Sequence, residues 1–192
     1  SAVGLIFGTV PARRAAARAK DFLDIEPLPA VLTVREAHAA QSYVVPPMHL
    51  TRESARGACQ QAITTAPQRL QGSFVQGGQE QFYLEGQISY AVPLEDDTLL
   101  LHCSTQHPTE MQHVVAQALK LPAAKVLIEC RRMGGGFGGK ESQSALFAAV
   151  AAVAARRAGR PVKLRLDRDD DFMITGGRHA FEFDYEAGFD EG

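Results

Sequence analysis

The chain has 192 residues, of which 45% are hydrophobic and 22% are charged. This composition is typical of globular proteins, and the length suits one domain, or one domain with part of another. Lysine and arginine number 20 against 22 aspartates and glutamates, which gives a formal net charge of −2. A nucleic-acid-binding surface needs a clustered basic excess, so we expect no nucleic-acid partner.

The sequence also predicts no membrane contact. Its longest wholly apolar run, Ala145 to Ala155, is shorter than the roughly 20 residues that cross a bilayer. The amino terminus has no charged segment leading into an apolar stretch and a cleavage site, so no signal peptide is predicted. Because it opens directly on an apolar strand over residues 3–8, we expect the sequence to start inside a larger domain.

The three cysteines, Cys59, Cys103 and Cys130, are far apart and form no C-x-x-C pair. They suit a reducing compartment, and we predict a cytoplasmic protein. By themselves they cannot hold an iron–sulfur cluster or a tetrahedral zinc ion. We expect them to be buried and unreactive, as free cysteines usually are.

The first fifty residues are predicted to form short elements that end at a linker. Thr33, with Glu36 three residues later, is a capping-box signature for a helix through Ala40. Residues 43–51 contain two adjacent prolines and no periodicity, so we place a linker and a domain boundary there. The other expected elements are a strand over 3–8, a helix from Pro11 to about Lys20, a half-buried strand over 21–26 and an extended segment over 30–32.

The middle of the chain is predicted to hold its most extended segments. A helix over 52–66 is stopped by Pro67, and residues 71–93 are extended except at Gly77-Gly78. Within them we expect a long strand over 82–92, bent at Gly86. An acidic turn over 95–97 then joins it to a return strand over 98–104, and a helix follows over 109–119.

A glycine loop over residues 133–141 organises the last third. An apolar strand over 126–130 precedes it, and an alanine-rich helix over 142–158 follows, with Gly159 as its C-cap. Beyond them we predict a strand over 162–166, a charged turn over 167–172, a small-residue loop over 174–177 and a strand over 181–187. The mixture of elements favours an α+β fold of mixed sheets with helices.

Five of the six residues from Gly134 to Gly139 are glycine, which supplies no side chain to a core. A strand, a glycine loop and a helix together direct N–H groups toward an anionic ligand. A Walker A loop is rejected because Glu141 stands where a magnesium-binding hydroxyl belongs. A dinucleotide fingerprint, with Asp167 as the ribose-binding acid, stays open, and a loop that serves packing alone is disfavoured.

Several segments identify the chain more closely. Gly134 to Glu141 resembles the molybdopterin-binding loop of the xanthine dehydrogenase/aldehyde oxidase family, and its xanthine dehydrogenase branch in particular. Residues 77–85 resemble a second signature of that family. Further blocks follow in the family's order at 104–106, 159–162, 166–171 and 174–179.

The resemblance implies a fragment of the large molybdenum subunit. Residues 1–45 would be the tail of an α/β hammerhead domain, and residues 52–192 would be an incomplete first molybdopterin-binding domain. The family hydroxylates a carbon next to a ring nitrogen with water as the oxygen source. In this branch it converts hypoxanthine and xanthine to urate, using molybdenum-molybdopterin, FAD and 2Fe-2S clusters.

Four residues would contribute to the site on this resemblance. The Gln79 amide would approach an oxo ligand of the metal, and the backbone of Phe137 and Gly138 would face the metal ligands and the pterin. None of these would be a direct metal ligand. Glu141 would face a purine substrate, although a carboxylate at the start of a helix could equally interact with the helix dipole.

The resemblance also implies what this stretch lacks. The family's substrate-binding arginine block and its catalytic glutamate do not occur here, so we expect no catalytic residue in this chain and no activity from it alone. Its partners would be the rest of the molybdenum subunit and an FAD/iron–sulfur subunit or domain. An aldehyde or other N-heterocycle hydroxylase, a dinucleotide-binding module and a non-catalytic assembly fragment remain as alternatives. The other acidic and histidine candidates, Glu80, Glu85, His102, His107, His113 and His179, are given no catalytic or metal-binding role.

Overall fold

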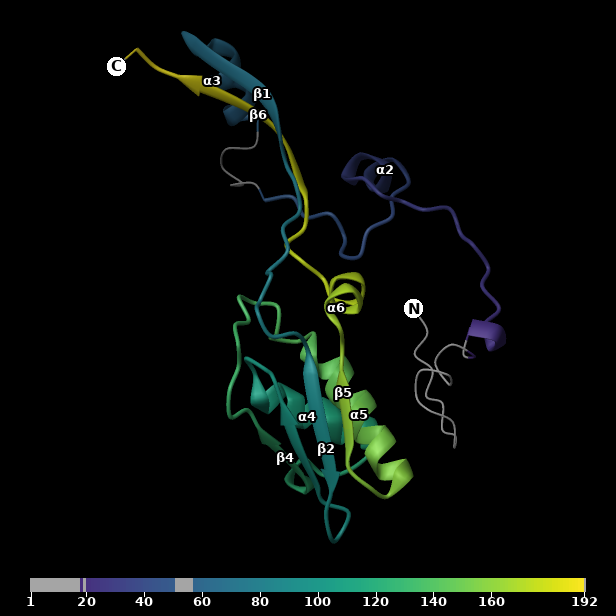
Figure 1. Ribbon diagram of the computed structural model, residues 1–192. Helices are drawn as coiled ribbons and strands as arrows, with labels where there is room; N and C mark the ends of the chain where they lie inside the picture. The colour runs from purple at the N-terminus through teal and green to yellow at the C-terminus, as the bar shows by residue number, and fades with distance from the viewer. Residues whose placement is uncertain (1–17, 19, 51–56, 192) are drawn as a thin grey trace. The chain divides into compact units, whose positions relative to one another are not determined.

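The computed structural model describes residues 18, 20–50 and 57–191, and the chain divides into two compact units (Figure 1). Unit 1 comprises residues 1–25 and 80–178, and unit 2 comprises residues 26–79 and 179–192. The predicted strand over 3–8, most of the predicted helix from Pro11 and the first residues of the 52–66 helix lie outside the described residues. The α+β prediction is confirmed, because helices accompany one mixed and one antiparallel sheet.

Unit 1 is built on a four-stranded sheet of order β4-β3-β2-β5. The predicted hairpin is present, with β2 (Ile88–Pro93) antiparallel to β3 (Leu99–Cys103). β5 (Val162–Arg165) pairs antiparallel with the other edge of β2, and β4 (Val126–Glu129) runs parallel to β3. A parallel neighbour requires a crossover, which the helix after β3 supplies.

Two helices, α4 (Pro108–Leu119) and α5 (Ser144–Ala158), pack against this sheet (Figure 1). Alternate residues of the strands are buried under them, as the two-residue period of a strand requires. The alanines of α5 let it approach the sheet closely, and Gly159 ends it at φ 62°, as predicted. The core consists of apolar residues of these elements, among them Ala91, Leu99, Leu101, Met111, Val115, Val126, Ala148, Ala151 and Ala152.

Two predictions in unit 1 were wrong. The strand expected over 82–92 begins only at Ile88, because Phe82 adopts φ 50° and residues 83–87 bond to the glycine loop. The charged turn expected over 167–172 is the helix α6 (Arg168–Ile174). The Asp167 side chain accepts from the Asp170 N–H, so the run of aspartates is an N-cap and an acidic first turn. A 3₁₀ turn, η3 (Ala123–Lys125), precedes β4 and was not predicted.

Unit 2 pairs two long strands, β1 (Gln68–Gln76) and β6 (Phe181–Phe189), antiparallel to one another (Figure 1). The helix α3 (Ala58–Thr65) contacts β6, and α2 (Val34–Ala39) begins at the predicted capping box, with both of its hydrogen bonds formed. Arg35 on α2 pairs with Glu182 at 2.6 Å. The half-buried strand expected over 21–26 is absent; residues 20–22 form the 3₁₀ turn η1 (Lys20–Phe22), and the residues after it are exposed.

The cysteines do not share one environment. Cys103 is buried, and burial raises the pKa of its thiol to about 12, with a smaller contribution from nearby Cys130. Cys130 is half-buried and Cys59 on α3 is exposed, so the expectation of three buried thiols was wrong for Cys59. None of the helices in the described part of the chain has the length and apolar character that a membrane crossing requires.

Candidate functional site around the glycine loop

The glycine loop joins β4 to α5 in unit 1. Its residues from Phe137 to Lys140 form a turn, and α5 begins only at Ser144, with Gln143 as its N-cap residue. Glu141 is exposed and precedes the helix, so it does not lie in the first helical turn as the sequence suggested. An interaction with the helix dipole, which is confined to the terminal turn, is therefore weaker here.

The segment from Tyr83 to Gln87, called the floor segment below, is hydrogen-bonded to the loop. The Glu85 N–H donates to the carbonyl of Gly134 at 3.2 Å, and the Gln87 side-chain amide donates to that of Gly139 at 2.9 Å. Tyr83 and Gln87 are both buried. This segment departs from strand geometry because several of its polar groups bond to the loop and to Asp171 in place of a sheet neighbour.

Lys140 also connects the loop to the floor segment. Its side chain is 0% exposed, its Nζ donates to the carbonyl of Glu85, and the ammonium lies 4.6 Å from the centroid of the Tyr83 ring. Burial lowers the pKa of Lys140, while the charges of Glu85 and Asp171 oppose that shift. The lysine that resembles a Walker A residue in the sequence therefore points into the protein and serves as an anchor.

Three of the five loop glycines face neighbouring side chains inside the chain. An added Cβ at Gly136 would lie 2.4 Å from the side-chain oxygen of Gln106, and those at Gly134 and Gly139 would meet Glu85 and Tyr83 at 2.3 and 2.6 Å. Real Cβ atoms do not approach so closely. At these three positions the glycines leave room for side chains of this chain, which the sequence argument did not foresee.

Gly138 is different. It adopts φ +86°, and an added Cβ there would find no atom within 4 Å. Packing thus leaves open space beside Gly138, which another molecule could fill. Its neighbour Phe137 also has a positive φ, 53°, and is 75% exposed. A bulky residue in this backbone region is uncommon and marks a candidate site.

Gln106, which follows β3, holds this part of the loop. Its side-chain oxygen accepts the N–H groups of Gly138 at 3.0 Å and Lys140 at 3.2 Å. Two amides that the sequence offered to an anion are therefore already bonded within the protein. Sequence reasoning quoted Gln106 within a family block and gave it no role; the signal was a polar tripeptide placed directly after a buried strand.

Phe137 and Gly138 lie on the turn, and Glu141 directly follows it. Gln79 is exposed and belongs to unit 2, so the loop geometry above concerns the other three residues. Its predicted role stays a prediction. Glu85 contributes its backbone to the floor, and His102 and His107 pair with Glu129 at 3.2 Å and Glu110 at 2.8 Å.

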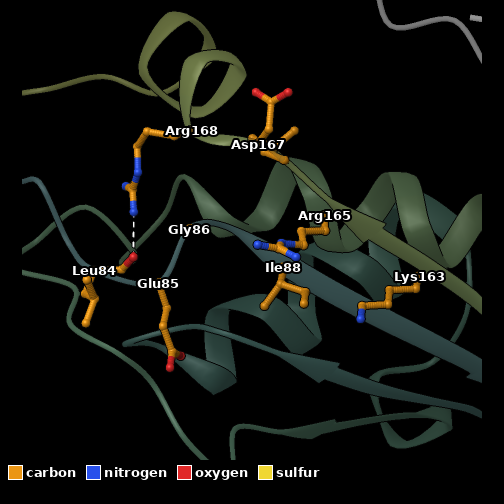
Figure 2. A pocket seen from close by; sticks show the side chains of 9 residues that line it. Leu84, Glu85, Gly86, Ile88, Lys163, Arg165, Asp167 and Arg168 are labelled. Atoms are coloured by element: carbon orange, nitrogen blue, oxygen red, sulfur yellow. Dashed lines mark hydrogen bonds between the residues drawn. The ribbon is translucent and has the colours of Figure 1, made fainter. Parts of the chain in front are cut away.

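A cleft of about 410 Å³ is lined by Leu84, Glu85 and Gly86 of the floor segment and by no residue of the glycine loop (Figure 2). Arg168 closes one side of it, donating to the carbonyl of Leu84 at 2.6 Å. Two further cations, Lys163 and Arg165, line it from β5. The cleft therefore does not include Phe137, Gly138 or Glu141.

No described residues form a group of three histidine, cysteine or acidic side chains that could hold a metal ion. The dinucleotide interpretation is weakened, because Asp167, its expected ribose-binding acid, caps α6.

Comparisons with known proteins show which family this chain belongs to. The family model described as the molybdopterin cofactor-binding domain matches residues 42–192. Xanthine dehydrogenase of Drosophila pseudoobscura pseudoobscura is 44% identical over 161 residues, covering 84% of this chain and 12% of that protein. Aldehyde oxidase 1 of Cavia porcellus is 44% identical over 182 residues, covering 94% of this chain and 13% of that protein. The chain thus spans only a small part of these relatives' length.

A solved structure of a Cu,Mo-CO dehydrogenase superimposes with a TM-score of 0.74. The alignment covers 93% of this chain and 25% of that one, at 22% identity. Such low identity speaks for a shared fold and for nothing finer.

Proposed function

The chain belongs to the molybdopterin cofactor-binding domain family, and from that premise we propose that it forms one wall of the molybdenum site of an oxidative hydroxylase. The single observation that carries the proposal is the open space beside Gly138, next to exposed Phe137. A side chain at position 138 would fill the space that a flat cofactor needs.

The residues of the loop suit a group that brings its own metal ligands. In this proposal the backbone at Phe137 and Gly138 faces the pterin, and the Gln79 side chain donates to an oxo ligand. Bound molybdenum cofactor supplies the electron acceptor and the oxygen derived from water; the chain supplies orientation and electrostatics. The Gln79 amide is a neutral donor, so it adds no charge at the cofactor.

Glu141 is proposed to recognise the substrate. It is exposed and is the last residue of the loop, and among the described residues its carboxylate forms no ion pair. A carboxylate accepts the N–H groups of a purine, and as an acid it donates to a ring nitrogen. Xanthine and hypoxanthine are therefore the proposed substrates.

A second candidate is an aldehyde or other N-heterocycle hydroxylase. The guinea-pig aldehyde oxidase matches at the same 44% identity as the fly xanthine dehydrogenase, which favours this alternative equally at the level of overall similarity. The two candidates differ in what Glu141 must do, because an aldehyde offers no ring N–H to it.

The remaining parts of the enzyme are proposed to lie in other regions. Residues 1–45 would complete an α/β hammerhead domain and residues 52–192 part of the first molybdopterin-binding domain. The catalytic base, the FAD and the 2Fe-2S clusters would come from the rest of the subunit or from a partner subunit. We retain a cytoplasmic location on the strength of the three unpaired cysteines.

The test uses the complete enzyme that contains this chain. We expect the wild type to contain molybdenum and to oxidise xanthine, and Glu141→Gln to lower kcat/KM for xanthine by about 100-fold at unchanged molybdenum content, as when a charged substrate contact is lost. Glu95→Gln, in the exposed acidic turn, is the matched control. Unchanged xanthine turnover would refute the role of Glu141. Turnover of aldehydes alone would favour the second candidate, and a metal-free wild type would refute the cofactor proposal.

A further inference from the structure

Gln106 makes three hydrogen bonds to two residues of the glycine loop. Its side-chain oxygen accepts from the N–H groups of Gly138 at 3.0 Å and Lys140 at 3.2 Å, and its own N–H donates to the Lys140 carbonyl at 2.8 Å. Of these contacts, only the last could be made by any residue other than proline. The first two need an acceptor at the end of a side chain of this length.

The loop is shaped around that acceptor. Phe137 and Gly138 both have positive φ values, 53° and 86°, and backbone N–H groups in turn conformations can point into one concavity. In this chain the oxygen of Gln106 occupies the concavity. Gly136 completes the fit, because a Cβ there would stand 2.4 Å from the same oxygen.

Neighbouring bonds fix Gln106 in turn. The Thr105 hydroxyl lies 3.3 Å from the Lys140 carbonyl and accepts the His107 N–H at 3.0 Å. Residues 104 and 105 are buried at the end of β3. Gln106 therefore extends from the rigid sheet to the loop, as a positioning contact should.

We propose that Gln106 is a positioning residue of the molybdenum site: its side-chain oxygen holds Phe137 and Gly138 in the strained turn that presents them to the cofactor. The inference rests on the proposed function. With the loop N–H groups bonded on the inner side, the open face of Gly138 and the ring of Phe137 are left to meet the cofactor. Removing the oxygen frees two amides and lets the turn relax.

Hydrogen exchange tests the geometry without reference to activity. In the complete enzyme, Gln106→Met keeps the side-chain length and removes the acceptor, and Gln106→Glu keeps an acceptor oxygen. We expect the amides of Gly138 and Lys140 to exchange about 10-fold faster in Gln106→Met than in wild type, the factor that one lost net hydrogen bond gives. Gln106→Glu should restore slow exchange. Equal exchange in all three proteins would overturn the proposal.

Kinetics and spectroscopy test the positioning role in the same variants. A small displacement of a positioning loop lowers kcat by about 10- to 100-fold, so we expect that loss of kcat in Gln106→Met. Its molybdenum content and KM should change by less than about threefold, and its Mo(V) signal should be altered. Gln106→Glu should recover kcat to within about fivefold of wild type, because it preserves the contact.

Gln112→Met is the matched control. The Gln112 side chain also makes two hydrogen bonds, to the carbonyls of Ala123 at 3.1 Å and Val126 at 2.9 Å, but none to the loop. Its loss should leave the Mo(V) signal and loop exchange unchanged. Faster loop exchange in Gln106→Met at unchanged kcat would overturn the positioning role. A wild-type enzyme without molybdenum would overturn the proposed function and this role with it, even with the exchange contrast intact.

Discussion

The hydroxyl of Tyr83 donates a 2.7 Å hydrogen bond to the carboxylate of Asp171, and both side chains are buried although they lie 88 positions apart. The second oxygen of Asp171 accepts the Gln87 N–H at 3.1 Å. Gln87 in turn reaches the Gly139 carbonyl. A single polar network thus connects α6, the floor segment and the glycine loop, and such buried networks hold their members in one arrangement when every group is paired.

Asp171→Ala should destabilise the protein by about 2–4 kcal/mol, because it leaves the Tyr83 hydroxyl and the Gln87 N–H buried without an acceptor. Urea unfolding followed by circular dichroism measures the loss. Asp169→Ala, at an exposed position of the same helix, is the control and should change stability by no more than about 0.5–1 kcal/mol, the usual range for a charge near a helix terminus. Equal losses in the two variants would show that the network contributes nothing beyond helix charge.

The network also explains where sequence reasoning succeeded and failed. The capping box at Thr33, the hairpin of β2 and β3, and the C-cap at Gly159 were predicted because each depends on residues close together in sequence. The segment from Tyr83 to Gln87 was predicted as part of a strand because the residues around it have extended character. Its hydrogen-bond partners are Gly134, Gly139 and Asp171. A local sequence pattern cannot predict contacts between residues so far apart in the sequence.

The candidate site divides in the same way. The loop and its flanking strand and helix were predicted from the sequence, because a run of glycines between a strand and a helix is a local signal. The reasons for the individual glycines were not, because they depend on side chains that arrive from elsewhere in the chain. Gln106 and Tyr83 fill the places beside Gly136 and Gly139, whereas Gly138 alone among the glycines of the loop faces open space.

Lys140→Met tests the buried ammonium. Burial lowers the pKa of Lys140, so between its folded pKa and the ordinary value of 10.5 the unfolded chain binds more protons than the folded one. The folded state is therefore penalised most at pH values below the folded pKa, and that penalty fades as the pH rises toward 10.5. We expect the unfolding free energy of wild type to rise relative to that of Lys140→Met between pH 7 and 10.

Urea unfolding of both proteins at intervals across that range measures the difference. Lys125→Met is the control, because Lys125 also donates to a backbone carbonyl, that of Asp96, at the surface. It gives the effect of losing an ammonium–carbonyl bond without deep burial. A difference between wild type and Lys140→Met that stays constant with pH would contradict the lowered pKa.

Gly136→Ala and Gly138→Ala separate packing from ligand approach within one loop. At Gly136 the new Cβ would displace the Gln106 side chain and break its two bonds to the loop, so we expect a loss of about 1–3 kcal/mol in unfolding free energy. At Gly138 the Cβ meets no atom, and only the positive φ is unfavourable, by about 1–2 kcal/mol. Stability alone would therefore rank Gly138→Ala as the milder change.

If the proposed function is right, the two variants have the opposite order in molybdenum content. Because the space beside Gly138 is where the pterin would approach, Gly138→Ala should lower the molybdenum content of the purified complete enzyme more than Gly136→Ala does, although its unfolding midpoint is the higher of the two. Metal analysis and thermal unfolding on the same samples provide both numbers. A fold defect predicts that Gly136→Ala loses more molybdenum, whereas a blocked cofactor approach predicts that Gly138→Ala does. If the molybdenum content of the two variants followed their stability, the space beside Gly138 would serve no ligand.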